Sequence, residues 1–200
     1  MSLSTLLQNI ADAEPGPKTC AVFDFDGTII SGYSATAFLK DQIARGEISP
    51  ADLVQLTQAA TRFGIGSLGF SALMAVHAQY LAGRSEAEYV ANSERLFRRA
   101  IAKLIYPEAR QLIKAHRAAG HSIAIISSAT PYQVLPAARD LGIEHVYATD
   151  LEVEDGQFTG GVVQPTCFGI GKVHAAERFT AQQGSDLENC FFYSDSTDDI

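Results

Sequence analysis

The segment FDFDGTII, residues 23–30, ends an apolar run with Asp24 and Asp26 and continues at once with glycine and threonine. In an extended strand, residues two apart point to the same side, so the two carboxylates would lie close together. Like charges at one place are costly unless a cation is near. A solvated Asp-Gly turn would also explain this segment, so taken by itself it leaves both interpretations open.

Three further polar features follow later in the chain. IAIISSAT places Ser127 at the end of an expected strand, and FGIGKVHAAERF places Lys172 at the start of an expected helix. FFYSDSTDDI places Asp195 and Asp199 at and just after the end of another strand. The carboxyl ends of parallel strands share one edge of a sheet, where open α/β proteins bind ligands. Together the features predict one site with acids, a hydroxyl and a cation, the set that a phosphate dianion requires.

Strands that alternate with helices would position these residues. Short β-branched or aromatic runs predict strands at 19–25, 121–127, 144–149 and 189–195. Helical patterns lie between most of them, and the one at 107–120 opens with proline and closes on glycine. The alternation predicts an α/β fold with a Rossmann-like, doubly wound parallel sheet. Asp155-Gly156, between two alternating runs in 150–161, predicts a β-hairpin.

Residues 34–106 contain no convincing strand and several helix starts, among them the capping pattern from Ser85 to Glu88, and therefore predict an all-helical insertion. Within it, residues 63–83 carry no formally charged side chain. Their glycines and polar residues favour a buried or interfacial helix over a transmembrane span.

Composition and charge narrow the classes of partner. The chain has 200 residues, 46% of them hydrophobic, and a formal charge of −8, which argues against nonspecific nucleic-acid binding. The cysteines at positions 20, 167 and 190 lack CxxC spacing, so neither a disulfide framework nor a zinc site is expected, and the setting predicted is the cytoplasm. Cys20 and Cys190 fall in strand runs and are predicted to be buried. Residues 1–17 predict a short amphipathic helix and a linker, not a secretion signal.

The order DxDGT, then an apolar run ending in serine, then lysine, then DxxxD resembles the four motifs of the haloacid dehalogenase superfamily, from Cys20 to Ile200. The helical insertion between the first two motifs is similar to the capped branch that includes phosphoserine phosphatases. It is also similar to the phosphatase-like domains that some bacteria fuse to a lysophospholipid acyltransferase. The resemblance implies a core at 18–33 and 107–200, a helical cap at 34–106, and a core that continues beyond Ile200.

The same resemblance implies a role for each motif residue. Asp24 would be the nucleophile that forms an aspartyl-phosphate, and Asp26 would be the general acid and then the general base. Phosphate would be bound by Ser127 and Lys172, with Thr28, Gly27 and Ser128 beside them. Mg²⁺ would be held by Asp24, the backbone carbonyl of Asp26 and Asp195, with Asp199 supporting these ligands.

The implied function is Mg²⁺-dependent hydrolysis of a small phosphomonoester. A glycerol phosphate or lysophospholipid is the expected substrate, with a peripheral membrane or a fused acyltransferase as a further partner. Phosphoserine phosphatases carry a glutamate where this chain has Tyr33, which argues against phosphoserine. Three alternatives stay open: a phosphoserine phosphatase, a phosphotransferase, and a non-catalytic regulatory or docking domain.

Overall fold

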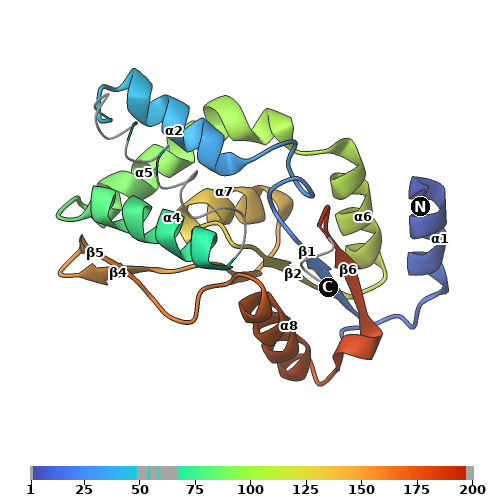
Figure 1. The fold of residues 1–200 in the computed structure, drawn as a ribbon. Coiled ribbons are helices and arrows are strands. Elements are labelled where there is room, and N and C mark those ends of the chain that lie inside the picture. The colour runs from blue at the N-terminus through green and yellow to red at the C-terminus, as the bar shows by residue number, and fades with distance from the viewer. Residues whose placement is uncertain (1, 49–53, 55–57, 59–66, 197–200) are drawn as a thin grey trace.

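A computed structural model of the chain describes residues 2–48, 54, 58 and 67–196 (Figure 1). Its main sheet has four strands, β1 (Cys20–Phe23), β2 (Ser122–Ile126), β3 (His145–Tyr147) and β6 (Cys190–Tyr193). The strands lie in the order β3-β2-β1-β6, and every neighbouring pair is parallel. The four predicted strands and the α/β fold class are therefore confirmed.

Helices cover both faces of this sheet, as a doubly wound fold requires. Ala21 and Phe23 pack with α6 (Pro107–Ala118) and α7 (Pro131–Leu141) on one face. Cys20 and Val22 point the other way and pack with α8 (Ile170–Gln182). All four residues of β1 are buried because this strand lies between two neighbours and two helical layers.

The N-terminal segment forms α1 (Leu3–Asp12), whose first turn is capped by the Ser2 side chain. The helix lies beside α6 (Figure 1). Ile10, on its predicted apolar stripe, is buried in the core. The expected amphipathic helix at the start of the chain is therefore present.

In the part of residues 34–106 that the structure describes, the regular elements are helices joined by short turns, and isolated β-bridges occur at Ser85 and Ile105. The elements are α2 (Ser34–Ala44), α4 (Ser67–Leu81), α5 (Glu86–Leu96), a π-helical turn η1 (Phe97–Ile101) and a 3-10 turn η2 (Ala102–Leu104). Helix α4 covers most of the uncharged stretch 63–83 and buries Met74, Ala78 and Leu81, while residues 63–66 lie outside the described part. No helix in the described residues is long and apolar enough to cross a membrane.

The predicted hairpin forms from β4 (Leu151–Glu154) and β5 (Gln157–Val162), and it packs on the helical segment. The amide of Gly83 donates to the carbonyl of Phe158 at 2.8 Å, and the Phe158 amide donates to the carbonyl of Arg84 at 3.0 Å. The Gln79 side chain donates to the Gly160 carbonyl at 3.0 Å. Segments about 75 residues apart in the chain, a spacing read from residues 83 and 158, thus form one unit beside the sheet.

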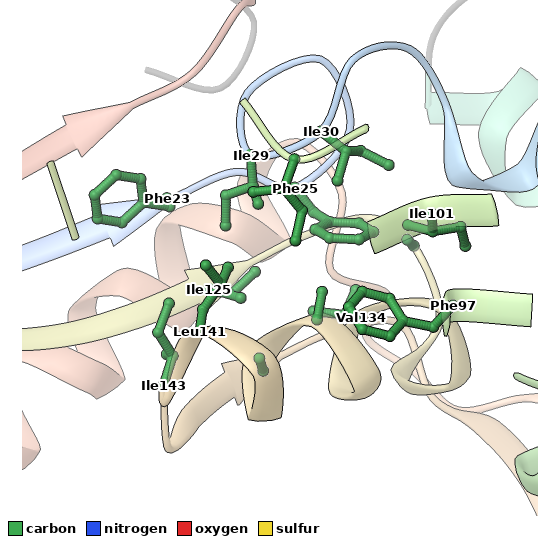
Figure 2. Packing of buried hydrophobic residues seen from close by; sticks show 14 of the residues in the cluster. Phe23, Phe25, Ile29, Ile30, Phe97, Ile101, Ile125, Val134, Leu141 and Ile143 are labelled. Carbon is green, nitrogen blue, oxygen red and sulfur yellow. The ribbon is translucent and has the colours of Figure 1, made fainter. Parts of the chain in front are cut away.

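The loop that follows β1 is fixed by apolar packing. Figure 2 shows Phe25 and Ile30 of this loop in one buried layer with Ile101 of η1 and Val134 of α7. Each of these side chains is at most 1% exposed. Burying a side chain of this kind contributes about 1.5–3 kcal/mol. This apolar packing fixes the loop that carries the polar residues.

Cys20, Cys167 and Cys190 are free thiols in the structure. Cys20 and Cys167 are buried, but Cys190 is only half-buried. The prediction of a buried Cys190 is wrong because β6 is an edge strand of the four-stranded sheet. Burial still raises the pKa of Cys167 to about 11 and that of Cys190 to about 12, so neither thiol is reactive near neutral pH.

Candidate active site

Asp24 directly follows β1 at the carboxyl edge of the sheet. Its amide donates to the carbonyl of Tyr193 at 2.9 Å, which continues the ladder between β1 and β6 by one residue. Its carboxylate is almost fully buried, with 6% of the residue exposed. A carboxylate taken out of water in this way needs a cationic or hydrogen-bonding partner.

Lys172 is that partner. Its Nζ lies 3.0 Å from Oδ1 of Asp24, and the lysine is only 3% exposed. Lys172 lies in the first turn of α8, after a sharply folded loop. At Gly171, an added Cβ would come within 1.9 Å of the Thr166 carbonyl oxygen, so only glycine allows the loop to approach so closely. The loop and the helix together aim the ammonium group at the end of β1.

Asp26 lies two residues further along, in the loop. Both of its carboxylate oxygens accept hydrogen bonds from Ser34, one from the amide at 2.7 Å and one from the hydroxyl at 3.1 Å. Burial raises the pKa of Asp26, the bonds from Ser34 and the charge of Lys172 lower it, the charge of Asp195 raises it, and the pKa stays above its ordinary value. A carboxyl group with a raised pKa suits proton transfer near neutral pH.

Asp195 follows β6 and packs against the same loop. Its amide donates to the Thr28 hydroxyl at 3.0 Å. A Cβ at Gly27 would lie 2.2 Å from Oδ2 of Asp195, so the missing side chain at this position makes room for the carboxylate. Gly27 also has a φ of +76°, which glycine adopts without the usual steric penalty. Two features of the loop therefore hold Asp195 against it, where the Asp195 charge acts on Asp26.

Ser127 directly follows β2, the strand next to β1. It is 1% exposed, and its hydroxyl accepts from the amide of Ala129 at 3.1 Å. Ser128 is half-buried in the same turn. The structure thus places the second motif at the same edge as the first, on the neighbouring strand.

The predicted site residues are therefore brought to one edge of the sheet wherever the structure describes them. Asp199 lies outside the described residues. The sequence did not point to Ser34, which begins α2 and binds Asp26, or to Gln133, which donates to the Ser34 hydroxyl. The pattern Thr130-x-x-Gln133 has the spacing of a capping box and could have marked the start of α7. No local sequence pattern indicates that Gln133 contacts Ser34.

The donor set fits a hard divalent cation. Asp24 contacts Lys172, and the charges of Lys172 and Asp195 both act on Asp26, so several carboxylates lie in this region, and oxygen is the ligand type that Mg²⁺ prefers. No group of three or more His, Cys, Asp or Glu side chains in the described part of the chain is placed to hold a metal. A site here would use two carboxylates and a backbone carbonyl.

The sequence matches the family of haloacid dehalogenase-like hydrolases over residues 21–200. The chain belongs to this family. It is 33% identical over 189 residues to a probable phosphatase of Mycobacterium tuberculosis (strain ATCC 25618 / H37Rv), covering 93% of this chain and 66% of that protein. It is 35% identical over 185 residues to a phosphoserine phosphatase of the same strain, covering 90% of this chain and 60% of that protein.

Among solved structures, a protein of unknown function from Bordetella pertussis Tohama I is similar, with a TM-score of 0.78 and 28% identity. The match covers 90% of this chain and 83% of that one. The chain spans less than two thirds of the length of the two relatives from M. tuberculosis.

Proposed function

We propose that this chain hydrolyses phosphomonoesters through a covalent acyl phosphate at Asp24, an aspartyl-phosphate. The observation that carries the proposal is the buried pair of Asp24 and Lys172 at the carboxyl edge of the sheet, with Asp26 two residues away. A carboxylate attacks a phosphate dianion only where positive charge offsets their repulsion. Lys172 supplies such charge 3.0 Å from the attacking group.

The reaction has two displacements at phosphorus. In the first, a carboxylate oxygen of Asp24 bonds to phosphorus as the bond from phosphorus to the ester oxygen breaks, and protonated Asp26 gives its proton to the departing oxygen. In the second, Asp26 takes a proton from water, the water oxygen bonds to phosphorus, and the bond to Asp24 breaks. Lys172 and the Ser127 hydroxyl hold the transferring phosphoryl oxygens in both steps. General acid–base help of this kind contributes roughly 10²–10⁴-fold.

Asp24, the backbone carbonyl of Asp26 and Asp195 would hold Mg²⁺, and Asp199 would support them. When bound, the cation neutralises the negative charge shared by these carboxylates and the substrate phosphate. The Thr28 hydroxyl keeps Asp195 in place by accepting a hydrogen bond from the Asp195 amide. Gly27 leaves room for the Asp195 carboxylate.

We propose a small uncharged or apolar alcohol as the leaving group, such as glycerol from glycerol phosphate or a monoacylglycerol from a lysophosphatidate. Tyr33 directly precedes Ser34 and is 66% exposed beside a cavity of about 480 Å³ that is also lined by Lys40, Arg99 and Lys103. Among the described residues that line it, the one acid is Asp41, which is already paired with Arg45 and Arg99. An ammonium group would therefore find no free carboxylate in the described part of this cavity.

Phosphoserine is the second candidate, favoured by the relative that is named a phosphoserine phosphatase. The cap at 34–106, the acyltransferase partner, the cytoplasmic setting and the lack of nucleic-acid binding stay predictions from the sequence. The cap would close over the substrate, with α2, α4 and α5 as its helices.

The experiment is a screen of the purified chain on a panel of phosphomonoesters, with Mg²⁺ and with EDTA. We expect phosphate release that EDTA stops and Mg²⁺ restores, with kcat/KM for glycerol phosphate above that for phosphoserine. A tenfold preference for phosphoserine would select the second candidate. No release from any ester, with Mg²⁺ present and the fold intact, would favour a binding or docking domain.

A further inference from the structure

Asp26 is held by a helix start rather than by its own loop. Ser34 is the first residue of α2, is fully buried, and binds both carboxylate oxygens of Asp26. The N-cap residue of α2, Tyr33, makes no side-chain capping bond. Asp26 therefore takes the place of the missing cap, where the helix dipole favours a negative charge. The orientation of Asp26 depends on where the Ser34 hydroxyl points.

The Ser34 hydroxyl is in turn held by Gln133 of α7. Nε2 of Gln133 donates to Oγ of Ser34 at 2.9 Å, and Gln133 is only 8% exposed. Because the Ser34 oxygen accepts this bond, its own hydrogen is directed to Asp26. The chain of bonds thus has one consistent direction, from Gln133 through Ser34 to Asp26.

The orientation of the Gln133 amide is also determined. Its oxygen accepts from the amide and from the hydroxyl of Thr130, both at 2.9 Å, in the capping box that begins α7. Since the oxygen is occupied by Thr130, the NH₂ group must face Ser34. Thr130, Ser34 and Gln133 are all buried, so water does not compete for these bonds.

We propose that Gln133 is a positioning residue for Asp26 and acts through the Ser34 hydroxyl. This inference rests on the proposed function, in which Asp26 protonates the leaving alcohol. The capping box at the start of α7 fixes Gln133, Gln133 fixes Ser34, and Ser34 holds the Asp26 carboxylate in one orientation. Catalytic groups lose effect when they are displaced by as little as 1 Å, so the loss of this support should slow proton transfer.

The first measurement compares two leaving groups. Hydrolysis of glycerol phosphate needs a proton on the departing alkoxide, whereas 4-nitrophenolate departs without one. We expect Gln133→Leu and Ser34→Ala to lower the ratio of kcat/KM for glycerol phosphate to kcat/KM for 4-nitrophenyl phosphate by about tenfold or more, as part of the roughly 10²–10⁴-fold effect of a general acid. A merely structural role would slow both substrates alike.

Two variants serve as comparisons. Gln133→Glu keeps an oxygen for Thr130 and so keeps the capping box, but it cannot donate to Ser34, and the ratio should fall as in Gln133→Leu. Gln42→Leu changes another buried glutamine, on α2 itself, whose Nε2 has no hydrogen-bond partner among the described residues. The ratio should be unchanged in Gln42→Leu.

The second measurement does not depend on activity. Gln133→Leu, Asp26→Ala and the double variant are compared by urea unfolding. If the bonds run from Gln133 to Asp26, the stability lost in the double variant is smaller than the sum of the single losses. The pair Gln42→Leu and Asp26→Ala should be additive.

The outcomes separate this inference from the proposed function. A lowered ratio together with non-additive stability supports the inference. An additive cycle overturns it whatever the rates show, and so does an unchanged ratio in an active enzyme. A parent chain that hydrolyses neither ester overturns the proposed function, and with it the role of Gln133 in catalysis, while the cycle still shows whether Gln133 and Asp26 are coupled.

Discussion

Lys172 and Asp24 lie 148 residues apart in the chain, yet the lysine Nζ is 3.0 Å from the aspartate Oδ1 in the interior of the protein. Each residue is less than a tenth exposed. A buried pair of this kind adds little to stability compared with a well-packed apolar pair. In the proposed mechanism, this pair keeps a charged nucleophile and a cation in contact, ready for an anionic substrate.

Removing the lysine should destabilise the protein as well as stop catalysis. We expect Lys172→Met to lower the free energy of unfolding by about 3 kcal/mol, because it leaves the Asp24 charge buried without this ammonium. Asp24→Asn in the same chain should recover part of the loss. Urea unfolding measures both effects.

Lys114→Met is the matched control, since Lys114 is an exposed lysine on α6. Its effect should stay within about 0.5 kcal/mol. If Lys172→Met and Lys114→Met lowered the free energy of unfolding equally, removing the buried lysine would be no more costly than removing an exposed one, and the expectation would be wrong.

A methyl group at Gly27 should disturb the metal site. The added Cβ would lie 2.2 Å from Oδ2 of Asp195 and must displace that carboxylate. We expect Gly27→Ala to raise the Mg²⁺ concentration for half-maximal phosphatase activity by about 10–100-fold, the range seen when support for a metal ligand is lost. A Mg²⁺ titration of the initial rate is the measurement.

Gly32→Ala controls for backbone strain in the same loop. Gly32 has a φ of +78°, close to the +76° of Gly27, but a Cβ there meets nothing within 4 Å. Both variants should lose similar stability, about 1 kcal/mol, while only Gly27→Ala changes the Mg²⁺ requirement. If both variants raised the Mg²⁺ requirement equally, the cause would be backbone strain and not displacement of the Asp195 carboxylate.

Much of this architecture could be predicted because its signals are local. The strands at 20–23 and 122–126 are short apolar runs, and the helix at 107–118 has proline at its start. The edge position of β6, and with it the exposure of Cys190, depends on strand order, which no local pattern encodes. The bond from Gln133 to Ser34 joins residues 99 positions apart, and the bond from Gln79 of α4 to Gly160 of the hairpin joins residues 81 positions apart. Such contacts follow from packing, so the sequence could not reveal them.

Stability should fall in mild acid because of a buried pair of histidines. Nδ1 of His116 lies 2.8 Å from Nδ1 of His121, and Nε2 of His116 lies 2.9 Å from the Tyr193 hydroxyl. Burial, and then the neighbouring His121, lowers the pKa of His116 from 6.5 to about 4. The unfolded chain therefore binds more protons than the folded protein between these values, so stability is complete above pH 6.5 and decreases as the pH falls towards 4.

Urea unfolding at pH 7 and pH 5 tests this. The parent should lose more stability between the two values than His116→Gln, by about 1–2 kcal/mol at a slope of 1.36 kcal/mol per pH unit. His174→Gln changes an exposed histidine and should behave as the parent does. If His116→Gln keeps the full acid sensitivity, the pair is not its source.

The covalent step at Asp24 can be tested most directly by trapping. The chain is mixed with glycerol phosphate and Mg²⁺, quenched in acid during turnover and treated with sodium borohydride, which reduces an acyl phosphate to an alcohol. Mass spectrometry of the peptide that spans residues 19–40 then locates the change. We expect Asp24 to be converted to homoserine only when the ester is present, and Asp24→Asn to release no phosphate. Steady phosphate release with Asp24 unreduced, or with another carboxylate reduced in its place, would contradict the assignment of Asp24 as the nucleophile.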